Sequence, residues 1–357
     1  MHVATFGKVE KREREMPEYC VTGGTGFIAS HLIRALLAAG HTVRATVRDP
    51  EDEAKVGFLW ELEGASERLQ LLRADLMVEG SFDDAVRGVD GVFHAASPVV
   101  VVGSGGGGGG KAAPPSKQDD EEEVRQRLVE PIVRGAANVL RSCARARPRR
   151  VVFTSSCSCV RYCGGAATAL NESHWSDAAY CAAHGLWYAY AKTVAEREAW
   201  RLAKERGLDM VVVNPSFVVG PVLGPAATST ALVVLALLRG DLPRYPNTTV
   251  GFVHVDDAVL AHVLAMEDPR ASGRLICSCH VAHWSEIVEA LRERHPQYRL
   301  PAECSGHKGD DRAHRMDTTK IRALGFPPFL SLQQMFDDCI KSFQDKGLLP
   351  LPLPPAN

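Results

Sequence analysis

Short runs of apolar, often β-branched residues alternate along this chain with longer segments in which apolar residues recur at helical spacing. Strand-like runs occupy 19–22, 42–48, 69–74, 90–96, 150–155 and 210–217, and helical patterns occupy 26–39, 51–63, 81–87, 121–145 and 186–206. Such alternation is expected when parallel strands are joined by helices that pack on the sheet between them. The pattern predicts an α/β fold with a doubly wound parallel sheet.

Four ranges depart from this rhythm. Residues 1–15 are mostly polar and are predicted to be a disordered extension, and 102–118 contains six consecutive glycines, a composition that cannot bury a core. After residue 220 the pattern loosens into shorter elements. We expect a nucleotide-binding domain at 16–220, a smaller substrate-binding lobe at 221–348 that is interleaved with the main core, and a disordered tail at 349–357.

Composition excludes several classes of function. Lys plus Arg (41) nearly balance Asp plus Glu (43), so no broad positive field would attract nucleic acid. No charge-free run of about 18 apolar residues exists to span a membrane. The ten cysteines form no regular framework and no signal peptide precedes them, so reduced thiols in a cytoplasmic protein are expected. Their spacing also does not fit zinc ligands, and no metal is predicted.

The first strand leads into a glycine-rich turn, VTGGTGFIA, which opens the first predicted helix. Gly23 permits the tight turn, Gly26 lets the backbone approach a phosphate, and the small Ala29 allows close packing of helix on strand. A helix N-terminus with free N–H groups binds anions. The turn predicts a Rossmann-type dinucleotide site, although a plain strand-to-helix turn would look similar.

Residues at the ends of the next strands indicate which dinucleotide binds. Arg48 ends the second strand, where NAD-binding folds usually carry an acid, and a cation there favours the 2′-phosphate of NADPH. Lys55 can add a second charge. Asp75 closes the third strand within reach of an adenine amino group, and the small residues that end the fourth strand, Ala95 to Ser97, let a cofactor lie against the backbone.

A possible reducing centre follows the fifth strand. Tyr188 and Lys192 lie four residues apart on one face of a predicted helix, and Ser156 ends the preceding strand. We expect the Lys192 ammonium to lower the pKa of the Tyr188 phenol, which would then act as a general acid. The Ser156 hydroxyl would hold a substrate carbonyl for that proton transfer. Tyr190, on another face, is interpreted as a packing residue.

At this point the chain resembles the extended short-chain dehydrogenases, in the plant branch of dihydroflavonol and cinnamoyl-CoA reductases. Within it the resemblance is greatest to the tetraketide α-pyrone reductases, particularly the second type. The resemblance covers approximately 16–347. The segments that carry it include VTGGTGFIASHLI, KVGFLWELEGASERL, ADLMVEGSFDDAV, TSSCSCVRY, LNESHWSD, LWYAYAKT, NPSFVVGP and YPNTTVGFVHVDD.

The resemblance implies a role for each matching position. It implies NADP(H) binding by Gly23, Gly26, Phe27, Ile28, Ala29, Arg48, Lys55, Asp75, Leu76, Ala95, Ala96, Ser97, Tyr188, Lys192, Pro215, Ser216, Phe217, Val218 and Thr230, and catalysis by Ser156, Tyr188 and Lys192. Ser156, Arg161 and Tyr188 would contact the substrate. The implied function is NADPH-dependent reduction of the ketone of tetraketide α-pyrones for sporopollenin in the pollen wall.

Two departures from the related enzymes bear on the substrate. Cinnamoyl-CoA reductases usually read NWYCYGK where this chain reads LWYAYAK, and dihydroflavonol reductases carry Asn where Arg161 stands. A reductase like either of these remains the alternative. A sugar-nucleotide epimerase or dehydratase and a non-enzymatic NADP-binding regulator are further alternatives. We expect a small hydrophobic carbonyl substrate, and a monomer or weak homo-oligomer that associates with polyketide synthases.

Overall fold

The computed structural model describes residues 16–98, 121–163, 169–306 and 313–351. The predicted extension at 1–15, the glycine-rich insertion at 102–118, the run at 164–167 and the tail from residue 352 lie outside these residues. The part of the tail that is described belongs to the folded chain, because Leu349 is 3% exposed and the Tyr298 hydroxyl donates to the Pro350 carbonyl at 3.1 Å. The predicted start of the tail at residue 349 is therefore too early.

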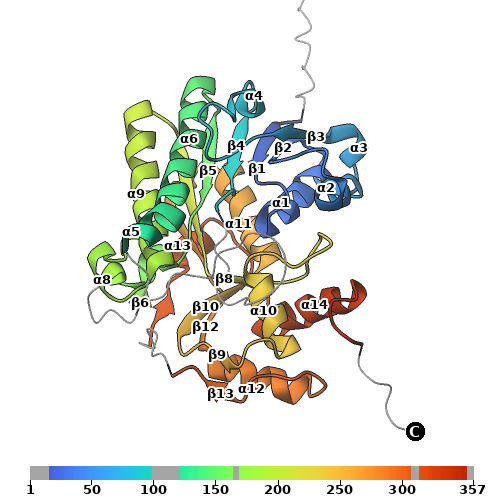
Figure 1. The fold of residues 1–357 in the computed structure, drawn as a ribbon. Helices are drawn as coiled ribbons and strands as arrows, with labels where there is room; N and C mark the ends of the chain where they lie inside the picture. Colours follow the sequence, from blue (N-terminus) through green and yellow to red (C-terminus); the bar gives the residue numbers. More distant parts are fainter. Residues whose placement is uncertain (1–15, 99–120, 164–168, 307–312, 352–357) are drawn as a thin grey trace, which may run out of the picture.

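A parallel sheet of seven strands forms the centre of the molecule (Figure 1). Its order is β11-β7-β5-β4-β1-β2-β3, and every pair of neighbours is parallel. The strands are β1 (Glu18–Thr22), β2 (Thr42–Val47), β3 (Leu69–Arg73), β4 (Gly91–His94), β5 (Arg150–Thr154), β7 (Met210–Pro215) and β11 (Gly273–Cys277). The predicted Rossmann-type α/β class is confirmed, and six strands lie within two residues of their predicted bounds.

Helices cover both faces of this sheet because each buries an apolar stripe against it. On one face, α1 (Phe27–Ala38) packs beside α11 (Val255–Glu267). On the other, α6 (Glu130–Ala146) packs between α4 (Asp83–Val86) and α9 (Trp187–Arg206). The helices α2 (Glu53–Trp60) and α3 (Ala65–Arg68) connect β2 to β3. The strand order reverses between β1 and β4, which is where such sheets bind ligands at the carboxyl ends of their strands.

The helix predicted at 121–145 is three elements in succession. The short α5 (Glu121–Val124) passes into a π-helical turn, η1 (Arg125–Val129), before α6 begins. Pro131 lies in the first turn of α6. Proline lacks the N–H that would close an α-helical bond to the preceding turn, so the wider turn precedes it.

A smaller lobe lies beyond the carboxyl ends of the large sheet (Figure 1). Its three-stranded sheet consists of β8 (Phe217–Val219), β10 (Thr249–His254) and β12 (His280–His283). Strand pairs join β9 (Arg244–Tyr245) to β13 (Glu303–Cys304) and β6 (Ala169–Leu170) to β14 (Arg315–Met316). The remaining helices are α7 (Ser158–Arg161), α8 (Ala178–Ala183), α10 (Thr230–Arg239), α12 (Trp284–Arg294), α13 (Thr319–Ala323) and α14 (Leu332–Asp345).

The large sheet takes its edge strand from the range assigned to the smaller lobe. β11 pairs with β7, and α11 packs on β5, β7 and β11, although all of α11 and β11 lie after residue 220. The chain thus leaves the nucleotide-binding core after β7 and returns to it through α11 and β11. The exit precedes residue 220, because β8 already belongs to the smaller lobe's sheet, and residue 220 does not separate two continuous domains.

Candidate functional site

The glycine turn after β1 has the backbone that its sequence predicted. Gly23 has a φ of +74°, in the left-handed region, and a Cβ there would lie 3.0 Å from both Cα and Cβ of Ala96. Gly26 is the N-cap of α1 and donates its N–H to the Gly23 carbonyl at 2.8 Å. Phe27 and Ala29 are buried in the first turn, and Ile28 is half-buried. The turn therefore places the N-terminus of α1 at the point between β1 and β4 where the strand order reverses. Sheets of this kind bind ligands in a crevice at that point, and a pyrophosphate would lie there.

The other wall of the crevice is held by a residue that sequence reasoning did not single out. The Thr22 hydroxyl accepts a hydrogen bond from Ala96 N at 3.0 Å and is bonded to His94 Nδ1 at 2.9 Å. Ala95 to Ser97 are half-buried beside the glycine turn. Burial, together with the charge of Lys192, lowers the pKa of His94 to about 3, so its imidazole is neutral. His94 is a packed residue of the crevice and is not exposed to a substrate.

Ser156 lies just beyond the end of β5, with its hydroxyl fixed by Ser158. Both Ser158 N, at 3.1 Å, and Ser158 Oγ, at 2.9 Å, donate to Ser156 Oγ. A hydroxyl has two acceptor positions and one proton to donate. Because Ser158 fills both acceptor positions, Ser156 is set to donate its proton to another oxygen. Sequence reasoning missed Ser158, although its place two residues after Ser156 was a signal.

Tyr188 and Lys192 lie on α9, facing this serine. Tyr188 is 44% exposed, and its hydroxyl is hydrogen-bonded with Ser156. Burial raises the pKa of Tyr188 to about 12, the nearby Cys159 thiol raises it further, and a hydrogen bond with Ser156 acts in the opposite direction. The sequence predicted that Lys192 lowers the pKa of Tyr188. That direction is wrong for this structure, because burial raises the pKa and Lys192 does not contribute to the shift. At neutral pH the phenol is protonated, as a general acid must be.

Lys192 is buried at the base of the site. Its Nζ donates to the Thr154 carbonyl, at the end of β5, at 3.3 Å. Burial lowers the pKa of Lys192, while Cys159 and Glu196 raise it. The lysine therefore ties α9 to β5. The structure brings Ser156, Tyr188 and Lys192 together at the carboxyl end of β5, where a carbonyl oxygen can receive one hydrogen bond from Ser156 and a proton from Tyr188.

The loop after β7 forms the next wall of the site. Cys157 N donates to the Pro215 carbonyl at 2.9 Å, and Ser216 Oγ donates to Ser278 Oγ at 2.7 Å. Phe217 packs edge-on against Trp284 and Phe252, with ring centroids 5.2 and 5.6 Å apart. These contacts join the serine loop to the smaller lobe.

The first helix of the smaller lobe is anchored to the same wall. Thr230 begins α10 and its hydroxyl donates to the Val218 carbonyl at 2.6 Å. Val218 itself is buried. This bond fixes the start of α10 beside the wall formed by Pro215 to Val218.

The residues expected at the adenosine end of a dinucleotide lie at the ends of β2 and β3. Arg48 is exposed, and no described residue forms an ion pair with its guanidinium. Lys55, also exposed, pairs with Asp52. The Asp75 carboxylate accepts from Met77 N at 2.8 Å, so it already closes a turn. Leu76 lies against Gly135 of α6. Of these four predicted positions, Arg48 has the side chain least engaged by the protein.

Arg161, expected to contact the substrate, is directed into the protein. It is 8% exposed, its Nη1 donates to the Tyr162 hydroxyl and its Nη2 to the Thr248 hydroxyl, both at 3.2 Å. The guanidinium also lies over the Tyr162 ring, 4.8 Å from its centroid. In this structure Arg161 joins α7 to the start of β10.

Other features of the described residues lie apart from this site. A surface groove of about 560 Å³ lies at the C-terminal end of α11, lined by Leu260, Val263 and Pro269 among others. It is near the amino end of β5, because Arg150 donates to the Ala265 carbonyl at 2.9 Å, so it is at the opposite edge of the sheet. Within the described ranges, no three His, Cys, Asp or Glu side chains cluster as metal ligands would.

The cysteines and the possibility of a membrane span were the other two features that the sequence raised. All ten cysteines lie in the described ranges, and each is a free thiol. Among the helices that the structure describes, none has the length and apolar character required to cross a bilayer.

Comparisons with known proteins agree with this geometry. A family model described as NAD(P)H-binding matches residues 23–227. The chain is 59% identical to tetraketide alpha-pyrone reductase 2 of Arabidopsis thaliana, over 94% of this chain and 100% of that protein. It is 44% identical to tetraketide alpha-pyrone reductase 1 of the same plant, over 94% of this chain and 98% of that protein.

A solved structure extends the likeness to three dimensions. Vestitone reductase from alfalfa (Medicago sativa) superposes with a TM-score of 0.75 at 31% identity, over 93% of this chain and all of that one. Cinnamoyl-CoA reductases and dihydroflavonol 4-reductases are also among the relatives. The chain therefore belongs to the NAD(P)H-binding reductase family that includes the plant tetraketide α-pyrone, cinnamoyl-CoA and dihydroflavonol reductases, and it is an oxidoreductase.

Proposed function

We propose that this chain is an NADPH-dependent carbonyl reductase that reduces the ketone of tetraketide α-pyrones to the alcohol. The observation that carries the proposal is the convergence of Ser156, Tyr188 and Lys192 at the end of β5, beside a glycine turn in which a Cβ at Gly23 would press against Ala96. The identity to a tetraketide alpha-pyrone reductase along nearly the whole chain supports this substrate class. The product would be a hydroxylated precursor of sporopollenin in the pollen wall.

The cofactor fits residues that are already in place. The N-terminus of α1 would hold the pyrophosphate, Ala95 to Ser97 and Pro215 to Val218 would line the path of the nicotinamide half, and Thr230 would support that wall. Bound there, NADPH supplies the hydride. Arg48 is an exposed cation with no competing ion pair among the described residues. It would bind the 2′-phosphate, with Lys55 and Asp75 nearby, and so select NADPH over NADH.

The chemistry of this chain's own residues concerns the ketone oxygen. Ser156, with both acceptor positions filled by Ser158, donates its proton to that oxygen and holds it beside Tyr188. As negative charge develops on the oxygen, Tyr188 transfers its proton to it. An alkoxide is a much stronger base than a phenolate, so a phenol with a pKa of about 12 still donates downhill. The Lys192 ammonium at the base of the site donates to the Thr154 carbonyl, which holds α9 against β5 and Tyr188 beside that oxygen.

The substrate's alkyl tail requires an apolar path from this oxygen. Leu223, Leu232 and Val233, around the start of α10, are half-buried, and we expect them to line that path. The buried Arg161 would shape the pocket through Tyr162 and Thr248. We further propose that the protein works in the cytoplasm as a monomer or weak homo-oligomer, in association with polyketide synthases.

A direct comparison of substrates tests the proposal. Purified protein with NADPH is given a tetraketide α-pyrone, a dihydroflavonol and a cinnamoyl-CoA in separate assays, and kcat/KM is compared. The proposal predicts the highest kcat/KM for the α-pyrone. A preference for either of the others would assign the chain to that substrate class instead, and no turnover of any ketone would support a regulator that only binds NADPH.

A further inference from the structure

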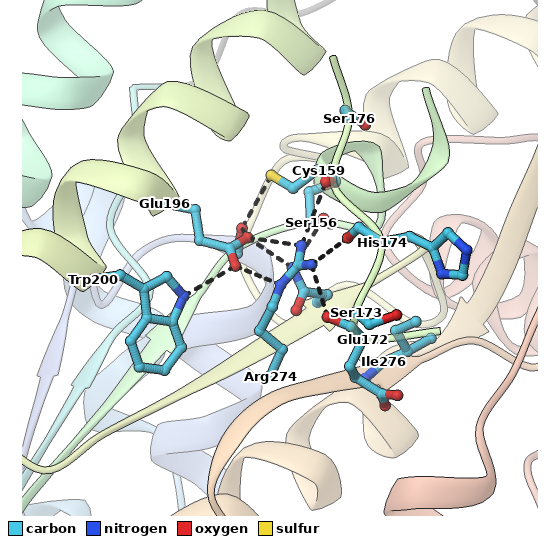
Figure 2. A network of polar contacts seen from close by, with 12 residues as sticks. Ser156, Cys159, Glu172, Ser173, His174, Ser176, Glu196, Trp200, Arg274 and Ile276 are labelled. Atoms are coloured by element: carbon cyan, nitrogen blue, oxygen red, sulfur yellow. Dashed lines mark hydrogen bonds and ion pairs between the residues drawn. The ribbon is translucent and has the colours of Figure 1, made fainter. Parts of the chain in front are cut away.

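A buried ion pair lies directly behind the catalytic serine (Figure 2). Glu196 lies on α9 and has no exposed side-chain surface, and Arg274 lies on β11 with 6% of its side chain exposed. The Arg274 Nε is 2.6 Å from Glu196 Oε1. Charges are rarely buried this deeply unless each is paired and hydrogen-bonded. Neither residue contacts the ketone oxygen or transfers a proton to it, so the burial of the pair needs a separate explanation.

The Glu196 carboxylate is the centre of a set of hydrogen bonds from the serine loop and the strands below it. Its Oε2 accepts from Ser155 Oγ at 2.5 Å and from Asn214 Nδ2 at 2.9 Å. The same Asn214 amide donates to the Ser156 carbonyl at 3.1 Å. Glu196 thus contacts the residue before Ser156 directly and Ser156 itself through Asn214.

Arg274 fixes the other side of the loop. Its Nη1 donates to the carbonyls of His174 and Glu172, at 2.5 and 3.1 Å, and its Nη2 lies 3.4 Å from the Cys159 carbonyl. The guanidinium stacks on Trp175, 4.0 Å from the ring centroid. The planar fork of arginine is suited to hold several oxygens in fixed positions. The segment that leaves Ser156 is therefore fastened at both ends.

Helix geometry connects this network to the acid and the lysine. Tyr188, Lys192 and Glu196 are spaced four residues apart on α9, so all three lie on one face of the helix. The same carboxylate that holds the Ser155–Ser156 loop is rigidly attached to the residues that the loop must face. A change at Glu196 therefore alters the distance between Ser156 and Tyr188 without touching the substrate.

We propose that Glu196 and Arg274 are a positioning pair that fixes Ser156 against Tyr188 and keeps a negative charge beside Lys192. This role rests on the proposed function, because it acts on the same reaction. Neither residue is a catalytic residue, since each acts through Ser155, Asn214 or Lys192.

The charge of Glu196 also acts on Lys192. Burial lowers the pKa of this lysine, and Cys159 and Glu196 oppose the lowering. The other titratable groups around Lys192 carry no charge at neutral pH. Burial raises the pKa of the Cys159 thiol and that of Tyr188, and lowers that of His94 to about 3. Glu196 is thus the charged group among them, and its partner Arg274 offsets part of its effect.

The test compares Glu196→Gln and Arg274→Met with a matched control, Glu205→Gln, an exposed acid that pairs with Arg201 on the same helix. We expect Glu196→Gln to reduce kcat about 10- to 100-fold, because a small misplacement of the reacting groups is sufficient for such a loss. NADPH affinity should be unchanged. Burial lowers the pKa of Lys192 and raises that of Tyr188, so we expect Lys192 to set the alkaline limb of the kcat–pH profile. In Glu196→Gln this limb should move down by about one pH unit. In Arg274→Met it should move up, because Glu196 is then unopposed.

Additional variants cover the case in which a single change unfolds the protein. Removing one partner leaves a buried charge unpaired, whereas the double variant Glu196→Gln/Arg274→Met leaves none. We expect the double variant to fold and still lose at least tenfold in kcat. Glu196→Asp keeps the charge but shortens the side chain, so the alkaline limb should stay near that of the unmodified protein while kcat falls.

Two results would overturn the proposal. One is a folded Glu196→Gln protein with the kcat and alkaline limb of the unmodified chain, and the other is a folded double variant with undiminished kcat. Either result would leave the proposed function standing, because the unmodified protein would still reduce the ketone. If the unmodified protein reduced no ketone, the proposed function would be wrong, and the positioning role, which depends on it, would be wrong as well.

Discussion

Replacing Tyr188 by Phe removes one hydroxyl and leaves the ring that α9 presents to the site. With a pKa of about 12, about one molecule in 10⁵ carries a phenolate at pH 7, so the proton is present on nearly every enzyme molecule. General acids contribute about 10²–10⁴-fold to turnover. We expect Tyr188→Phe to lower kcat about a thousandfold, which corresponds to about 4 kcal/mol in activation free energy.

The assay is NADPH oxidation at saturating ketone, followed at 340 nm by its absorbance, with NADPH affinity measured separately by fluorescence. Tyr190→Phe is the matched control: Tyr190 lies two residues away, is half-buried, and packs edge-on against Trp187 at 5.9 Å. Tyr190 lies on another face of α9 than Tyr188, so kcat should not change. A Tyr188→Phe protein with kcat within about tenfold of the unmodified enzyme would refute general acid catalysis by Tyr188.

Three further changes test the cofactor turn and the serine. Arg48→Ala should weaken NADPH binding about 10- to 100-fold and leave NADH binding unchanged, since one charge-assisted contact contributes about 1.5–3 kcal/mol; equal losses measured by titration would exclude a contact with the 2′-phosphate. Gly23→Ala should lower the melting temperature more than Gly88→Ala, since both glycines have positive φ but only Gly23 would place a Cβ against neighbouring atoms; equal shifts would contradict this. Ser158→Ala should lower kcat about three- to tenfold, because Ser156 loses one of its two donors; an unchanged kcat would show that Ser158 does not orient it.

Local sequence was sufficient for the elements that form the nucleotide-binding half. The β-branched runs at β5 and β7 are buried on both faces, and the glycine turn has a left-handed residue at Gly23 where only glycine fits. Tyr188 and Lys192 share a helix face because 3.6 residues complete a turn. Each of these features depends on neighbours a few residues away, which a sequence shows directly.

Features that depend on distant pairing were not predictable in this way. β11 joins the sheet by pairing with β7, some 60 residues earlier in the chain, and the five residues of β11 do not indicate which strand they pair with. The side chain of Arg161 turns inward because Thr248, 87 residues later, accepts from it. Burial raises the pKa of Tyr188, and the four-residue spacing between Tyr188 and Lys192 gives no information about that burial.

Glu196 illustrates a signal that was present but ambiguous. It lies in the mostly charged run Ala195–Glu198, which is typical of a solvent-exposed helix face. Only its spacing of four residues from Lys192 and eight from Tyr188 indicates that it points inward. Its partner Arg274 is a charged residue in an apolar strand. The two residues meet only because β11 pairs with β7, a contact between distant parts of the chain.

Hydride transfer to the ketone tests the central claim most directly. The purified chain is incubated with a tetraketide α-pyrone and with NADPH deuterated at both C4 positions, and the product is analysed by mass spectrometry. The account predicts an alcohol with one deuterium on the former carbonyl carbon for each NADPH oxidised, formed by the unmodified protein and almost absent with Tyr188→Phe. Oxidation of NADPH without deuterium in the product, or equal product from both proteins, would contradict it.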